Sequence, residues 1–113
     1  MRRRFGTRSW QASFGVVVIV SFFVLFLPND DVPSGFPPGT DKLVHGALFA
    51  ALALTGRRAG VPTAWLLPTL TLYAIASEVV QAVPALGRSA SVWDALADVV
   101  GIALGWLLAR LVR

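Results

Sequence analysis

Four long apolar runs dominate the pattern of hydrophobic and polar positions along the chain. They cover about residues 10–27, 41–56, 62–83 and 91–112. Runs of this length are typical of helices rather than strands, and they approach the roughly 20 apolar residues that a helix needs to cross the hydrocarbon layer of a bilayer. The pattern therefore predicts an all-α fold, a four-helix transmembrane bundle in which residues 1–113 form a single membrane domain.

Polar segments rich in proline, glycine or arginine separate these runs. Residues 28–39 read PNDDVPSGFPPG, and their four Pro and two Gly exclude a regular helix or a central strand. Arg57, Arg58 and Gly60 indicate a short basic turn, and residues 84–91 (PALGRSAS) indicate a second loop. We expect the proline-rich segment to be an external linker.

The composition favours a bilayer as the solvent for these runs. With 56% hydrophobic and 14% charged residues, a soluble domain of 113 residues would leave large apolar patches exposed, whereas a membrane accepts them. The lack of Cys excludes disulfides and thiolate metal sites, and a single His argues against zinc. No spaced ligand motif requires a metal, although a carboxylate-rich outer cluster could accept Mg²⁺ or Ca²⁺. We therefore predict no cofactor and no bound metal.

The charges are distributed unevenly between the two ends of the predicted helices. Because the net charge of +4 comes from short basic groups beside the runs, we expect anionic lipid headgroups rather than nucleic acid as the counter-charge. Lys42, Arg88 and all six acidic residues lie on one side of the four-span arrangement. The other eight basic residues lie on the opposite side: Arg2, Arg3, Arg4, Arg8, Arg57, Arg58, Arg110 and Arg113.

This bias predicts the orientation of the protein. Basic residues near membrane spans are retained in the cytoplasm, so both termini are expected to be cytoplasmic. A cleaved secretory signal is the alternative interpretation of the first run, but no small-x-small cleavage site follows Leu27 and three more apolar runs do.

Asp41 and His45 are the first candidates for chemistry on the acidic side. They are four residues apart, which on a helix places them on one face about one turn from each other. A carboxylate at this spacing can orient and charge an imidazole. The alternative is that Asp41 only stabilises the first turn of its helix and that His45 is an interfacial polar residue.

Glu78 is the ionisable residue predicted to lie deepest in the third run. It shares a helical face with Gln81 and lies about two turns inside the membrane from Pro84. A carboxylate at this depth is neutralised or recruits a partner, and the candidates at the same level are Lys42, His45 and Arg88. The alternative is an interhelical hydrogen bond that only locks the packing.

The fourth run begins with a polar face that continues as a face of small residues. Ser91 and Asp94 match a helix capping box, and Asp98 lies one turn further along the same face. Gly101 and Gly105 extend the stripe as a G-x-x-x-G match, which in an apolar span indicates close helix contact more often than a ligand site. We therefore expect Asp98 to face the bundle.

Arg88 is the one arginine predicted on the outer side, in the loop between the third and fourth runs. It could bridge Glu78 to Asp94, or bind an anionic headgroup or phosphate through two parallel hydrogen bonds. The residues favour neither use over the other.

Three fragments together resemble the VanZ-like family of small bacterial membrane proteins. They are DKLVHGALFAALAL from Asp41, YAIASEVVQ from Tyr73 and GRSASVWDALADVVGIALG from Gly87. The resemblance implies a multi-pass protein of the bacterial inner membrane, in a family named for a member linked to reduced susceptibility to the glycopeptide antibiotic teicoplanin. The positions that match the family's motifs are Asp41, Lys42, His45, Glu78, Gln81, Gly87, Arg88 and Asp94. Asp98 departs from the family, which usually has Asn there, and adds a carboxylate.

From these residues we expect one outward-facing polar site that acts on, or only binds, a lipid headgroup or a cell-wall precursor. In this hypothesis His45 and Glu78 exchange a proton, Asp41 orients His45, and Arg88 holds an anionic group. Binding roles are expected for Lys42, Gln81, Arg88, Asp94 and Asp98.

Two other classes of function use the same residues. The network could be structural, holding short helices together while the protein contacts another membrane protein. A proton-coupled transporter with Asp41, His45 and Glu78 as the relay is less favoured, because the chain is small and shows no internal repeat.

Overall fold

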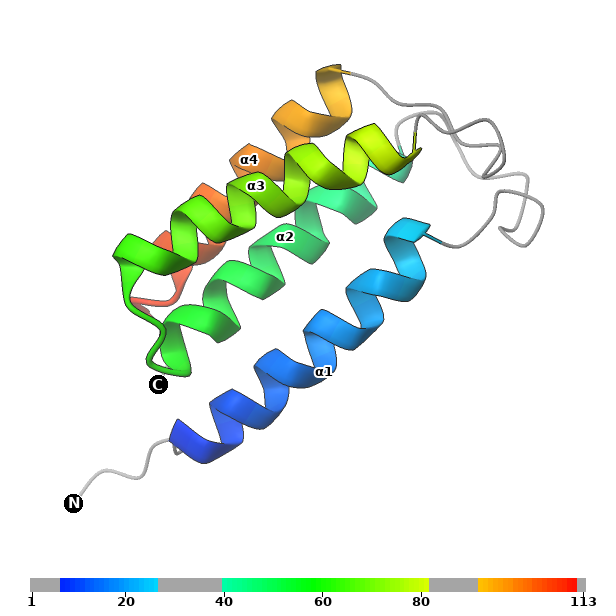
Figure 1. Ribbon diagram of the computed structural model, residues 1–113. Helices are drawn as coiled ribbons and strands as arrows, with labels where there is room; N and C mark the ends of the chain where they lie inside the picture. Colours follow the sequence, from blue (N-terminus) through cyan, green and yellow to red (C-terminus); the bar gives the residue numbers. More distant parts are fainter. Residues whose placement is uncertain (1–6, 27–39, 82–91, 112–113) are drawn as a thin grey trace.

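The computed structural model describes residues 7–26, 40–81 and 92–111, and within these residues the fold is entirely helical. Helix α1 covers Thr7–Phe26, α2 Thr40–Arg58, α3 Thr63–Gln81 and α4 Val92–Leu108. Successive helices run in opposite directions along one elongated bundle (Figure 1). The all-α prediction is confirmed, and each helix falls on one of the four predicted runs.

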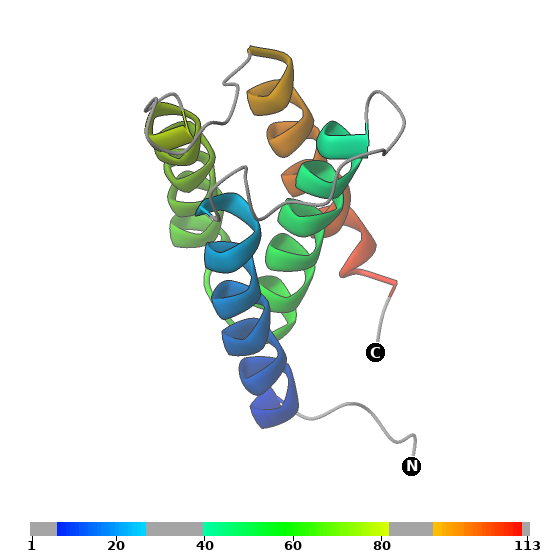
Figure 2. The same ribbon diagram turned by 90° about the vertical axis from the view of Figure 1, so that its right-hand side faces the viewer.

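Helix α2 occupies the centre of the bundle. It contacts α1, α3 and α4, with its most extensive contact against α4. Figure 2 shows α4 crossing α2, with its start between α3 and α2 and its end on the far side of α2 from α1 and α3. Phe49, Leu52 and Ala53 recur at helical spacing on α2 and are fully buried. The buried side chains that pack with them come from the other three helices: Leu25, Leu66, Leu70, Ala74 and Ile102.

Small residues allow α2 and α4 to approach at backbone contact distance. A Cβ atom at Gly101 would collide with the carbonyl oxygen of Gly46, and one at Gly105 would collide with that of Ala50. Gly46 and Ala50 therefore form the α2 half of the contact, opposite the two glycines of α4. The expected role of the G-x-x-x-G stripe in close helix contact is confirmed.

One end of the bundle, which we call the basic end, is tied together by arginine and tryptophan. It contains the last turn of α2 with Arg57 and Arg58, the short turn to α3, and the end of α4. The Arg57 guanidinium lies 3.9 Å from the centre of the Trp106 ring and donates a 2.7 Å hydrogen bond to the Trp106 carbonyl. The Trp106 indole in turn donates to the Thr63 hydroxyl at 3.0 Å. These contacts join α2, α3 and α4. The turn from α2 to α3 contains Gly60 with a φ of 96°, a conformation that would be strained for a residue with a side chain.

A part-buried hydroxyl pair joins helix α1 to α3. The Ser21 and Tyr73 hydroxyls are 2.7 Å apart, linking α1 to α3. The Tyr73 ring also contacts Phe49 and Phe22, at centroid distances of 5.6 and 5.7 Å. Tyr73 therefore connects α1, α2 and α3 through a single side chain.

Two of the described helices are long and apolar enough to cross a membrane. They are Thr7–Leu25 in α1 and Thr63–Val80 in α3, of which 11% and 28% are buried inside the bundle. Such low burial is unlike a core helix of a soluble protein, so the two helices weakly favour a membrane location. The apolar part of α4, Ala95–Leu108, is shorter, and α2 carries charges at both its ends. Length and composition thus support two spans, fewer than the four predicted.

We predict that Gly105→Ala destabilises the bundle, because the added methyl group collides with backbone atoms of α2 that cannot rotate away. Overpacking of this kind costs about 1–3 kcal/mol. The measurement is the unfolding midpoint of the purified protein in detergent. Gly15→Ala is the matched control, since a Cβ there has no atom within 4 Å. Equal stability of the two variants would contradict the α2–α4 contact.

Candidate functional site

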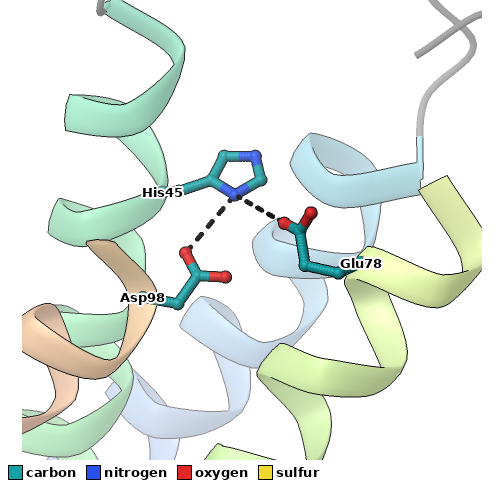
Figure 3. Close-up of side chains that lie close together, drawn as sticks. All are labelled: His45, Glu78 and Asp98. Atoms are coloured by element: carbon teal, nitrogen blue, oxygen red, sulfur yellow. Dashed lines mark ion pairs between the residues drawn. The ribbon is translucent and has the colours of Figure 1, made fainter. Parts of the chain in front are cut away.

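Three ionisable side chains from three different helices converge at the end opposite the basic end. His45 lies in the second turn of α2, Asp98 in the second turn of α4 and Glu78 in the last turn of α3. We call these three residues the polar cluster. Figure 3 shows that their functional groups point toward one another.

His45 lies between the two carboxylates. Its Nδ1 is 3.3 Å from Asp98 Oδ1 and 4.0 Å from Glu78 Oε1. The His45 and Asp98 side chains are fully buried, and the Glu78 side chain is 11% exposed. The cluster is therefore closed on the sides of α2 and α4, and its one partly open side is that of Glu78.

The contact between α2 and α4 fixes the position of Asp98 relative to His45. Asp98 precedes Gly101 by three residues and so lies on the same face of α4. His45 directly precedes Gly46, which meets Gly101 across the interface. Because both helices are pinned at this point, the imidazole and the carboxylate face each other with little freedom to separate.

Glu78 reaches the cluster from the buried face of α3. Ala74, one turn earlier, is buried in the core, and so is the neighbouring Ser77. The Ser77 hydroxyl donates a 2.8 Å hydrogen bond to the Ala74 carbonyl within its own helix. Glu78 is thus the group through which this turn of α3 meets His45.

The charges of the polar cluster do not balance by themselves. Two ionised carboxylates and one imidazolium carry one net negative charge, and a buried net charge is costly in a low dielectric. A further proton, a cationic side chain or a bound cation would neutralise the three groups. Its composition is therefore suited to taking up positive charge.

The structure describes the side chains of only some of the remaining predicted site residues. Lys42 lies on α2 with an exposed side chain, three residues before His45. Asp41, Gln81 and Asp94 lie on α2, α3 and α4, but their side chains are outside the described residues, as is the whole of Arg88. The expected pairing of Asp41 with His45 and the expected bridge through Arg88 therefore stay predictions.

Sequence reasoning placed Glu78 and His45 at one level and missed the contact between His45 and Asp98. Spacing within a helix favoured Asp41 as the carboxylate nearest the imidazole, whereas the closer described carboxylate comes from α4. The signal that could have found it is the pair Gly46 and Ala50, a small-x-x-x-small stripe that matches Gly101 and Gly105.

Comparisons with protein-family models, with curated proteins and with solved structures found no match to this chain. The resemblance to the VanZ-like family rests on the three sequence fragments alone. The function is therefore argued from the geometry of the polar cluster.

We predict that His45 and Asp98 are energetically coupled. In a double-mutant cycle with His45→Gln and Asp98→Asn, residues in contact give a coupling of about 0.5–3 kcal/mol in the free energy of unfolding. The control cycle pairs Asp98→Asn with Ser13→Ala. Ser13 lies near the basic end, two residues after Gln11, whose side chain bonds to the carbonyl of Ala59.

For residues that are not in contact, such as Asp98 and Ser13, the changes in the free energy of unfolding add to within about 0.5 kcal/mol. Additive results in both cycles would show that the imidazole and the Asp98 carboxylate do not interact.

Proposed function

We propose that this chain is a four-span protein of the bacterial inner membrane, similar to the VanZ-like family, with both termini in the cytoplasm. Its polar cluster is the centre of an outward-facing site that binds, or acts on, the headgroup of an envelope lipid or of a lipid-linked cell-wall precursor. The observation that carries the proposal is the burial of His45 and Asp98 beside Glu78, on three separate helices at one end of the bundle.

The arrangement of the helices supports four spans despite the modest apolarity of α2. Helix α2 contacts the three other helices, and His45 and Thr55 are buried in these contacts, so its polar residues need not face lipid. The 17 residues of α4 reach about 25 Å at 1.5 Å per residue, close to the hydrocarbon thickness of a thin bilayer. Both helices are therefore compatible with a transmembrane position.

The distribution of charge supports the orientation. Arg57 and Arg58 end α2 at the basic end, and Arg8 and Arg110 lie beside the ends of α1 and α4 there. The polar cluster lies at the other end of the same helices (Figure 1). By the positive-inside rule the basic end faces the cytoplasm and the polar cluster faces the envelope.

The depth of the polar cluster supports a site rather than a solvated surface. Ionisable groups within a membrane bundle are expensive, and they commonly mark ligand or ion sites. Glu78 keeps the cluster partly accessible, and the exposed Lys42 on the same helix as His45 provides a cationic group for an anionic headgroup. This combination suits a ligand that carries both hydrogen-bonding and anionic groups.

Single-cysteine labelling tests the orientation, because the chain contains no Cys. We expect a membrane-impermeant maleimide to label Ser34→Cys and Ser89→Cys in intact cells. Ala64→Cys, at the exposed start of α3, and Arg110→Cys should react only after the membrane is opened. Labelling of Ala64→Cys and Ser89→Cys from the same side would contradict the proposed topology.

Substitution of the polar cluster tests the site. In a teicoplanin-susceptible bacterial host we expect the protein to raise the inhibitory concentration of the drug. His45→Gln and Glu78→Gln should abolish this increase, because they remove the titratable groups while nearly keeping the side-chain volumes.

Ser77→Ala is the matched control, since Ser77 is buried beside Glu78 and its hydroxyl donates a hydrogen bond within its own helix. Abundance in the membrane is measured for every variant. If the cluster variants lose abundance along with the phenotype, the network is structural; if they keep both, the site is elsewhere.

A further inference from the structure

The polar cluster has the donor set of a metal site. It offers one imidazole nitrogen and two carboxylate oxygens, and a ligand atom from each residue can be chosen so that all three lie within 4.8 Å of one another. The donors come from α2, α3 and α4, so they do not form a sequence motif with the spacing of metal ligands. Convergence of this kind is visible only in three dimensions.

The distances are close to those around a bound ion. Zinc binds nitrogen and oxygen at about 2.0–2.2 Å, so two ligands of a tetrahedral ion are about 3.4 Å apart. The 3.3 Å between His45 Nδ1 and Asp98 Oδ1 matches this separation without movement. The 4.0 Å to Glu78 Oε1 requires that carboxylate to approach by a few tenths of an ångström or more. Glu78 has the longest side chain of the three and is the one that is partly exposed.

Charge also favours a dication over water or an anion at this position. A divalent ion, two carboxylates and a neutral imidazole sum to zero, so the ion and its three ligands would together form an electroneutral site. The two positions that are fully buried, His45 and Asp98, are those for which compensation matters most.

We propose that His45, Glu78 and Asp98 bind one divalent first-row metal ion. Mixed imidazole and carboxylate donors suit Zn²⁺ and Mn²⁺ better than a soft ion that prefers thiolate. Three protein ligands leave at least one coordination position for water or another ligand, the arrangement typical of catalytic rather than structural zinc sites. Water or a ligand would reach it from the side of Glu78, whose side chain is partly exposed. This proposal departs from the expectation from sequence that no metal binds.

The test uses the purified full-length protein in detergent micelles, treated with a chelator and then dialysed against ZnCl₂ or, separately, MnCl₂. Elemental analysis is expected to give one ion per chain, and the unfolding midpoint is expected to rise with the ion present. Wild-type protein that retains no ion above the detergent blank, and shows no rise in its midpoint, would overturn the proposal.

Variants locate the ion. Asp98→Asn, Glu78→Gln and His45→Gln should each weaken binding by at least about tenfold, because each removes a direct ligand and even indirect partners cost 10- to 100-fold. Ser77→Ala and Asp30→Asn are the controls, the first for packing beside Glu78 and the second for loss of a carboxylate elsewhere. Metal binding that survives all three cluster substitutions would place the ion outside the cluster.

The metal site and the proposed function fail in distinguishable ways. If the wild type binds one ion through the cluster but the cluster variants keep the teicoplanin phenotype, the metal site stands and the proposed function is wrong. If the cluster variants lose the phenotype at normal abundance while the wild type binds no ion, the proposed function stands and the metal site is wrong.

Discussion

Backbone contact between α2 and α4 is the constraint on which the rest of the structure depends. Small residues at a helix–helix interface let the two backbones approach closely, which strengthens the packing between them. Gly101 and Gly105 provide that packing against Gly46 and Ala50. The same contact fixes the rotation of both helices and hence which side chains meet one turn further along. His45 and Asp98 are opposed because the glycine contact beside them allows no other arrangement.

The two ends of the bundle have different roles. Contacts at one end hold the helices together, and the other end carries the ionisable groups. At the basic end, Arg57, Trp106 and Thr63 join three helices through a cation–π contact and two hydrogen bonds. At the other end the same three helices carry the polar cluster. The contacts at the basic end hold the three helices in place. Side chains on helices held in this way keep their relative positions better than side chains on loops. The structure thus presents ionisable groups, which a membrane penalises, on a framework that holds them together.

The helices could be predicted from sequence because their signals are local. Apolar runs, the proline-rich segment and the basic turn determine where each helix begins and ends, and the G-x-x-x-G stripe identifies one face of α4. The partner of His45 could not be predicted in the same way. Asp41 is close to it along the chain, but Asp98 is close to it in space, and that proximity depends on how two helices rotate against each other. The central position of α2 also could not be predicted. Its lower apolarity is typical of a central helix, but it is equally typical of a short span with a hydrated end.

Asp98 determines the charge of the polar cluster. Without it, Glu78 and a protonated His45 would form a neutral pair. The second carboxylate adds a negative charge at a fully buried position, 3.3 Å from the imidazole. A buried charge persists only where something compensates it, because its removal from water is otherwise too costly. Two carboxylates beside one imidazole therefore attract positive charge, and a divalent ion coordinated by all three side chains would supply it.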